Sequence, residues 1–145
     1  MRQKSGKFFE VVVAYEKINE DGLTKNVRET VVAEAFTCGE AENRALEETA
    51  SMSYGEVDCQ KVGIAPYKEI FFADDGDIFY KTRVSLITFD EVSGKEKRTN
   101  VYHLTNANTI EAARKNIVEA YNGTTIDYVI ASISETKITE VYEKK

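Results

Sequence analysis

Basic and aromatic side chains lie close together in the second half of the chain, at spacings suited to nucleic-acid binding. Lys81 and Arg83 are two residues apart, so both point to the same face of a strand. Aromatic rings stack on unpaired bases, each stack contributing about 1–3 kcal/mol, while lysine and arginine follow the phosphate backbone. We therefore predict a site for single-stranded nucleic acid. Its residues are Lys81, Arg83, Lys95, Lys97, Arg98 and Tyr102.

The same side chains also have a structural interpretation. Tyrosine and phenylalanine are common in strands, where they pack in the core. The charges of Lys95, Lys97 and Arg98 also fit an edge strand that is protected against sheet-to-sheet aggregation. The sequence leaves both interpretations open.

The sequence predicts no catalytic residue, no cofactor and no metal ligand. His103, the one histidine, lies in a predicted strand without a recognisable nucleophile, so we interpret it as structural. Asp74–Asp77 fits a solvated turn, because it lacks the alternating ligands and the final glutamate of an EF-type calcium loop. Acid pairs such as Glu47-Glu48 fit the solvated face of a helix, and no phosphate-binding glycine loop is present. We therefore predict that the protein is not an enzyme.

The second half of the chain resembles the first half at an offset of 71 residues. Val13 corresponds to Val84, and the segment Glu69–Phe71 corresponds to Glu140–Tyr142. Self-similarity of this kind indicates a repeated supersecondary unit, which constrains the architecture before any residue is given a role.

Each half begins with the pattern of a β-hairpin. Apolar residues alternate from Phe9 to Tyr15, and the turn signals Asn19–Gly22 and Asp90–Gly94 each separate two strand-like segments. In the second hairpin Lys81 and Arg83 alternate with apolar residues, so one face is polar and the other is buried. The predicted strands are Phe8–Ile18, Asn26–Ala35, Glu56–Ala65, Tyr67–Phe72, Phe79–Phe89, Lys95–Thr105, Asp127–Ser134 and Ile138–Tyr142.

One helix is predicted in each half, after a capping box. Thr37 and Glu40 have the spacing of a capping box, in which the threonine hydroxyl accepts from the glutamate amide and the glutamate side chain reaches back to the amide of the cap residue. We place the second cap at Asn108. The helices then run to about Ser51 and to about Tyr121. Their expected inward residues are Ala41, Ala45, Leu46, Met52, Ile110, Ala113, Ile117 and Ala120.

These elements predict an α+β fold made by tandem duplication of a strand-strand-helix-strand unit, with pseudo-twofold packing. The repeats span 8–72 and 79–142, and the acidic turn 73–78 joins them in a single compact domain, 1–145. A hairpin, one further strand and one helix leave apolar surface uncovered, so we expect the two units to pack together or to share one sheet.

Length and composition restrict the class of protein. A chain of 145 residues buries enough surface to fold without disulfides, and Cys38 and Cys59 match no paired or metal-binding spacing. We therefore expect a cytoplasmic protein with no membrane partner, since the longest apolar stretches are only strand-sized. The net charge of -6 argues against binding to duplex DNA through phosphate contacts alone.

Two segments resemble the uncharacterised family called domain of unknown function 4494. The first is Glu69–Leu104, with Asp75–Asp77, Leu86–Glu91 and Ser93–Lys97 as its most similar parts, and the second runs from Gly123 to Thr136. The resemblance implies a short cytoplasmic protein of gut anaerobes and of their phages or mobile elements. It implies no activity and no functional residues. A phage or mobile-element setting favours nucleic-acid metabolism or interference with host defence.

Three hypotheses follow for the function. The first is single-stranded DNA binding in phage or mobile-element DNA metabolism, through the six residues named above. The second is a protein-interaction or inhibitor module for a host or phage protein, through an acidic helix surface formed by Glu40, Glu42, Glu47 and Glu48. The third is a small-ligand site at the seam between the repeats. The oligomeric state does not follow from the sequence.

Overall fold

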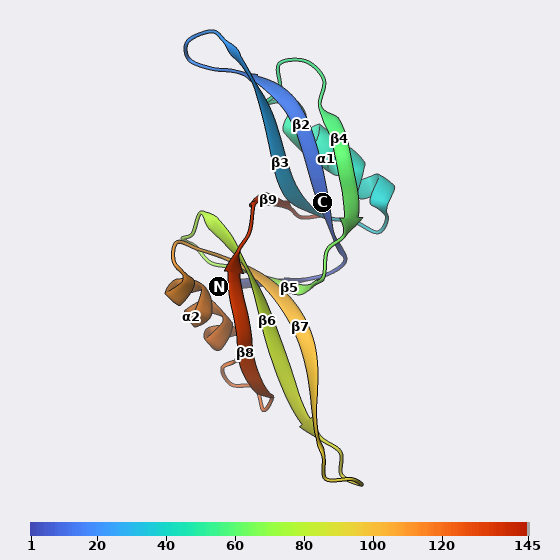
Figure 1. Ribbon diagram of the computed structural model, residues 1–145, viewed down its shortest axis with the longest axis vertical. Coiled ribbons are helices and arrows are strands. Elements are labelled where there is room, and N and C mark those ends of the chain that lie inside the picture. Colours follow the sequence, from blue (N-terminus) through green and yellow to red (C-terminus); the bar gives the residue numbers. More distant parts are fainter. Residues whose placement is uncertain (145) are drawn as a thin grey trace. The chain divides into compact units, whose positions relative to one another are not determined.

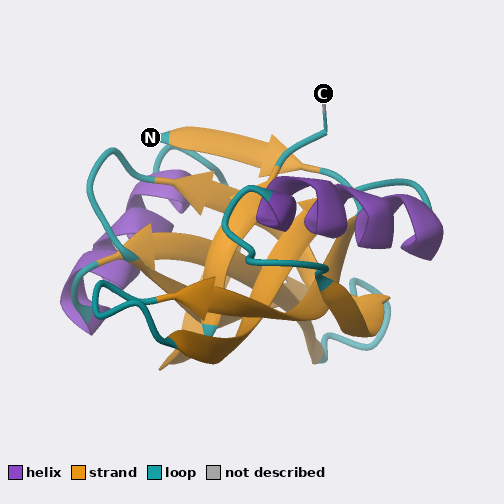
Figure 2. Cartoon of the chain, turned by 90° about the horizontal axis from the view of Figure 1, so that it is seen from above, coloured by secondary structure: helices purple, strands orange, loops and turns teal. Residues whose placement is uncertain are grey.

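The computed structural model describes residues 1–144 and has an α+β architecture, as the sequence predicts (Figure 1). These residues contain two helices and nine strands, and the strands form two sheets. Strands, orange in Figure 2, make up most of the chain. Neither helix within residues 1–144 is long and apolar enough to span a membrane.

The chain forms two compact units, and each unit combines segments that are distant in sequence. The β6 unit consists of Met1–Gly6 and Pro66–Thr136, and the β2 unit consists of Lys7–Ala65 and the described residues from Lys137 onward. The predicted repeats 8–72 and 79–142 do not coincide with these units. The last strand of the first repeat, Tyr67–Phe72, lies in the β6 unit, and the last strand of the second repeat, Ile138–Tyr142, lies in the β2 unit.

The β2 unit is a four-stranded sheet with one face covered by α1 (Cys38–Ala50). β2 pairs antiparallel with both β3 and β4, and β9 pairs parallel with β3. The predicted inward face of β2 is confirmed, since the side chains from Phe9 to Tyr15 at alternate positions are buried in the core. The sheet order is β4 (Asp58–Ile64), β2 (Phe8–Ile18), β3 (Thr24–Glu34) and β9 (Ile138–Tyr142).

The β6 unit is a five-stranded sheet with α2 (Ile110–Tyr121) on one face. β6 pairs antiparallel with β7 and β8, β7 pairs parallel with β5, and β1 lies at the edge. β1 is not among the predicted strands, because its four residues carry no apolar alternation. The sheet order is β1 (Arg2–Ser5), β5 (Tyr67–Phe72), β7 (Glu96–Ala107), β6 (Ile78–Phe89) and β8 (Asp127–Glu135).

The first predicted helix cap is confirmed and the second is wrong by one residue. The Thr37 hydroxyl accepts a hydrogen bond from the Glu40 amide at 3.2 Å. The cap of α2 is Thr109, whose backbone is extended and whose hydroxyl accepts from the Ala112 amide at 3.1 Å. Asn108 instead accepts from the Asp77 amide at 3.1 Å.

The inward faces of the helices are narrower than predicted. Ala41, Ala45, Ala113 and Ile117 are buried, whereas Leu46 and Ala120 are only half-buried. Met52 and Ile110 were expected to point inward and are exposed, at 41% and 52%. Met52 lies beyond the end of α1, and Ile110 is the first residue of α2, so neither sits in a helical turn that packs on the sheet.

The acidic turn 73–78 is held in place by the side chain of Asn106. The Asn106 Oδ1 accepts from the Ala73 amide at 2.8 Å, and its Nδ2 donates to the carbonyls of Ala73 and Gly76, both at 3.0 Å. Gly76 has a φ of 144°, and a Cβ there would lie 2.6 Å from backbone atoms of Ala107. The turn is therefore an ordered closure between β5 and β6.

Candidate nucleic-acid interface

The two faces of the β6 unit's sheet differ in chemistry. Tyr80, Thr82 and Val84 alternate on the face that α2 covers, and all three are buried. Lys81 and Arg83 therefore point to the opposite face, hereafter the α2-free face. The pattern predicted for this strand, polar on one side and buried on the other, is present.

Four of the six predicted binding residues share the α2-free face. Tyr102 lies directly opposite Arg83 in the β6–β7 register, and Arg98 lies opposite Ile87. Positions directly opposite one another on antiparallel strands have their side chains on the same face. Lys81, Arg83, Tyr102 and Arg98 consequently line one strip that runs toward the tip of the hairpin.

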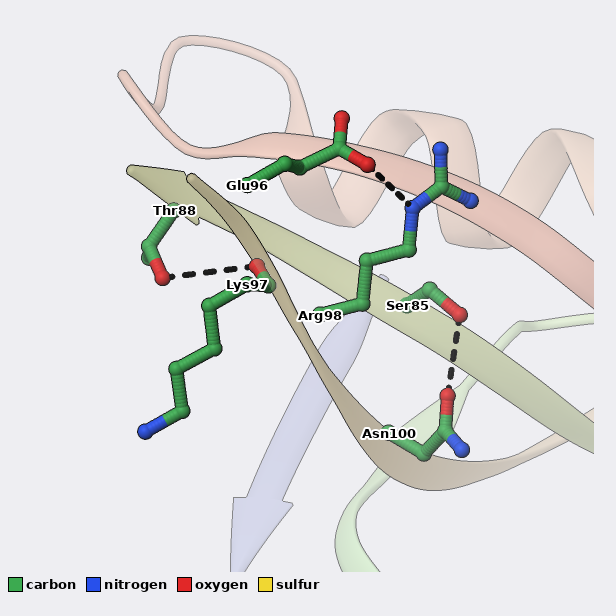
Figure 3. A network of polar contacts seen from close by, with 6 residues as sticks. All are labelled: Ser85, Thr88, Glu96, Lys97, Arg98 and Asn100. Atoms are coloured by element: carbon green, nitrogen blue, oxygen red, sulfur yellow. Dashed lines mark hydrogen bonds and ion pairs between the residues drawn. The ribbon is translucent and has the colours of Figure 1, made fainter. Parts of the chain in front are cut away.

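The other two predicted residues do not join this strip. Lys97 is paired with Thr88 and points to the other face, away from Arg98, as Figure 3 shows. Lys95 lies in the turn before β7 begins at Glu96. Their neighbourhood in sequence suggested a single cluster, but consecutive strand residues point to opposite faces.

The strip places a lysine over an aromatic ring and leaves an arginine exposed beside them. The Lys81 Nζ lies 4.9 Å from the centre of the Tyr102 ring, which is a cation–π distance. Lys81 and Tyr102 are half-buried, and Arg83 is exposed. Ser85, two residues after Arg83 in β6, donates a hydrogen bond to the Asn100 Oδ1 at 2.9 Å (Figure 3).

Arg98 contributes less positive charge than its position suggests. Its Nε lies 3.1 Å from the Glu96 Oε2 on the same face, with side-chain exposures of 52% and 44% (Figure 3). An ion pair this exposed is worth little to stability, about 0–1 kcal/mol. It does, however, place a carboxylate where a phosphate would approach.

His103 lies under α2 and is held as a neutral side chain. It is 1% exposed, and its Nε2 is 2.7 Å from the Tyr121 hydroxyl. Burial lowers the pKa of His103 to about 4. A backbone contact at Glu69 opposes this lowering, and the positive charge of Lys68 adds a smaller lowering. Among residues 1–144, the His103 Nδ1 and the facing Thr82 hydroxyl have no hydrogen-bond partner. The imidazole thus packs in the core, with Phe71 and Tyr121 as its ring neighbours.

Comparison with known proteins assigns the chain to a family. A family model matches residues 7–144, nearly the whole chain. The chain belongs to this family, Domain of unknown function (DUF4494). The resemblance seen in the sequence is therefore confirmed. No curated protein and no solved structure matches the chain.

The acidic residues of α1 in this DUF4494 chain do not form one uniform surface. The Glu40 carboxylate accepts from the Phe36 amide at 3.0 Å, and Glu48 pairs with Arg44 at 3.0 Å.

Burial, and next the nearby Glu42 carboxylate, raise the pKa of the Cys59 thiol. A raised pKa leaves less of this thiol as thiolate at neutral pH, which makes Cys59 a weaker nucleophile.

A cavity of about 540 Å³ lies within the β2 unit of the DUF4494 chain. Tyr15 and Tyr54 contribute to its walls, together with the charged residues Arg28 and Glu56. The Tyr15 hydroxyl donates to the Glu29 carboxylate at 2.7 Å, and burial is the main reason that the pKa of Tyr15 rises to about 12.

In residues 1–144 no group of three or more His, Cys, Asp or Glu side chains is placed to hold a metal ion.

Proposed function

We propose that this DUF4494 protein is a non-enzymatic binding protein for single-stranded nucleic acid, acting in phage or mobile-element DNA metabolism. The α2-free face of the β6 unit is the binding surface. The observation that carries this proposal is the grouping of Lys81, Arg83 and Tyr102 on adjacent strands, with Tyr102 directly opposite Arg83. An aromatic ring beside two cations can stack a base while the cations contact flanking phosphates.

The charge of the protein predicts weak and salt-sensitive binding. Each phosphate neutralised on a single strand contributes a slope of about -0.7 to log K against log salt, so Lys81 and Arg83 together give a slope of about -1.4. The net charge of -6 opposes association. Binding is therefore expected mainly at low ionic strength.

The proposal is tested by fluorescence anisotropy with a labelled oligothymidylate at low salt. Lys81→Ala/Arg83→Ala should lose most of the binding, because it removes both cations of the strip. Lys95→Ala/Lys97→Ala is the matched control, since it removes the same charge from outside the strip. Equal losses in the two double variants, or no binding by the unmodified protein, would contradict the proposal.

Removing the carboxylate beside Arg98 gives the complementary test. Glu96→Gln should strengthen binding and steepen the salt dependence, because the Arg98 guanidinium loses its 3.1 Å partner. An unchanged affinity would mean that Arg98 lies outside the contacted surface.

A small-ligand function is a further candidate, favoured by the cavity of about 540 Å³ in the β2 unit. All of the residues that line this cavity belong to the first repeat, so a site at the seam between the repeats stays a prediction. The volume of the cavity lies within the range of small-molecule sites, and Tyr15 and Tyr54 give it aromatic walls. Native mass spectrometry of protein purified without denaturation should then show a retained ligand, and Tyr54→Ala should release it. The hypothesis of a protein-interaction or inhibitor module stays a prediction.

We also propose that the chain arose by tandem duplication of a strand-strand-helix-strand unit. Irregular positions support this, since the β2–β4 register shifts between Val12 and Val13 and the β6–β8 register shifts 71 residues later, between Arg83 and Val84. The helix caps Thr37 and Thr109 fall at the equivalent point after each hairpin. An experimental structure in which these two bulges failed to superpose would argue against duplication, and pseudo-twofold packing stays a prediction.

A further inference from the structure

A polar pair, Ser85 with Asn100, lies on the α2-free face of the β6 unit. The two residues are register partners, and their row follows the row of Arg83 and Tyr102 toward the hairpin tip. Residues at alternate positions of a strand share one face, so the pair projects from the same face as the strip. Neighbouring rows are about 7 Å apart, which makes the pair an immediate neighbour of the Tyr102 ring.

The Tyr102 ring is contacted by Lys81 from the side away from this pair. Lys81 is the register partner of Leu104, which follows Tyr102 by two residues along β7. The Lys81 Nζ covers one face of the ring at 4.9 Å. A base therefore stacks on the other face of the ring, and there it lies toward Ser85 and Asn100.

Ser85 fixes the orientation of the Asn100 side-chain amide. The Ser85 hydroxyl donates to the Asn100 Oδ1 at 2.9 Å, and Ser85 is only 7% exposed (Figure 3). With its oxygen engaged, the amide presents its Nδ2 group, which donates hydrogen bonds and accepts none. Asn100 is exposed, so a bound base can reach this donor.

The same row continues onto β8 with an apolar side chain. Val129 is the register partner of Ser85 on the other side of β6, and it is 42% exposed. A base over this row meets the valine at one end and the Asn100 amide at the other. Apolar surface beside one placed polar group is a combination that orients bound ring systems.

We propose that Asn100, oriented by Ser85, makes this surface selective for bases that carry a carbonyl group where cytosine and adenine carry an amino group. These bases are thymine, uracil and guanine. The inference rests on the proposed function and specifies its ligand. The carbonyl oxygen accepts from the Asn100 Nδ2, whereas an amino group would bring one donor against another.

The serine–asparagine bond is not a requirement of the fold. The equivalent places of the β2 unit, counted from the register shifts of β2 and β6, hold Ala14 and its partner Arg28. An alanine side chain cannot make this bond, yet β2 and β3 form a complete hairpin. The polar pair is thus specific to the unit that carries the strip.

Fluorescence anisotropy with two labelled oligonucleotides of equal length, oligodeoxyuridylate and oligodeoxycytidylate, measures the selectivity at low salt and neutral pH. Their bases differ only in the carbonyl or amino group and in the adjacent ring nitrogen. The unmodified protein should bind the uracil oligonucleotide about three- to tenfold more tightly, as one hydrogen bond predicts. Equal binding of both would overturn the selectivity alone, whereas binding of neither would overturn the proposed function as well.

Asn100→Asp should reverse the preference, because a carboxylate accepts from the amino group of cytosine. Its negative charge weakens the binding of both oligonucleotides, so the ratio of the two affinities is compared. Asn122→Asp is the matched control, since it adds the same charge at the C-terminal cap of α2. The control should keep the ratio of the unmodified protein. An unchanged ratio in Asn100→Asp, or an equal shift in the control, would contradict the role of Asn100.

Ser85→Ala tests whether the serine orients the amide. Without the hydroxyl, the Asn100 side chain can turn and present either its oxygen or its nitrogen, so it suits both kinds of base. The preference for uracil should then be lost while binding itself persists, because Lys81, Arg83 and Tyr102 are unchanged. A preference retained in Ser85→Ala would overturn the positioning role of Ser85.

Discussion

At the scale of residues, the two units differ most in the polarity of the surface beneath their helices. The β2 unit places Val11 and Val31 there, both fully buried. The β6 unit has Thr82 and His103 paired at the corresponding positions of its hairpin, also buried. A buried polar group without a partner costs about 1–3 kcal/mol, a cost that the valine pair of the β2 unit does not carry.

The lowered pKa of His103 predicts a loss of stability in mild acid. The folded protein holds this histidine neutral down to about pH 4, whereas the unfolded chain takes up the proton near pH 6.5. The contribution of His103 is therefore fully present at neutral pH and declines as the pH falls from about 6.5 to about 4. The full shift corresponds to on the order of 3 kcal/mol.

Urea unfolding followed by circular dichroism at several pH values measures this loss, since the chain has no tryptophan. His103→Gln is the reference, because it lacks the titrating group and retains the carboxylates common to both proteins. The excess loss in the unmodified protein should appear between pH 6.5 and 4. Parallel curves for the two proteins, or an imidazole NMR titration near pH 6.5, would contradict a buried neutral His103.

Gly76 is the residue at which a single methyl group should be most costly. Its φ of 144° is unfavourable for other residues, and a Cβ would lie 2.6 Å from the backbone of Ala107. Gly76→Ala should therefore destabilise the protein by about 3 kcal/mol or more. Gly22→Ala, at a φ of 80° with open space around it, should cost only about 1 kcal/mol. Similar unfolding midpoints for the two variants would contradict this packing.

At the scale of elements, the sequence predicted segments well and side-chain placement less well. The strand Phe8–Ile18 has its predicted bounds because apolar alternation and a glycine turn coincide there. The α2 cap is shifted because Asn108 and Thr109 are both good caps, and only the contact of Asn108 with Asp77 separates them. That contact joins residues 31 positions apart and leaves no local signal.

The assigned α2 cap is tested by Thr109→Ala and Asn108→Ala. Loss of the Thr109 hydroxyl should lower stability by about 1 kcal/mol and weaken exchange protection at the Ala112 amide. Asn108→Ala should leave the Ala112 amide protected and affect the Asp77 amide instead. Hydrogen exchange measured by NMR distinguishes the two amides. Loss of protection at the Ala112 amide in the Asn108 variant would instead indicate that Asn108 caps α2.

At the scale of the complete chain, topology determines which strands pair, and local sequence patterns do not reveal these partners. Tyr67–Phe72 and Ile138–Tyr142 were predicted as strands with their observed bounds, but their partners are β7 and β3. Strand propensity is local, whereas partner choice depends on the length of the connection. The candidate strip shows the same limit, because alternation predicts the shared face of Lys81 and Arg83 but only the β6–β7 register places Tyr102 beside Arg83.

This topology predicts that each terminus supports the unit built mainly from the opposite half of the chain. Residues 1–6 supply β1, which pairs with β5 in the β6 unit. Residues 137–144 include β9, which pairs with β3 in the β2 unit. Deletion of residues 1–6 should therefore reduce exchange protection in β5 by roughly tenfold, because only an exposed edge strand is lost.

Deletion from residue 137 onward should have the larger effect and should act on β3. It uncovers Val31, Val32 and Ala33, so protection there should fall by roughly a hundredfold while β5 and β7 stay protected. The two truncated proteins serve as controls for each other, and hydrogen exchange with mass spectrometry resolves the strands. If each deletion instead weakened the unit nearest to it in sequence, the parallel pairings β5–β7 and β3–β9 would be wrong.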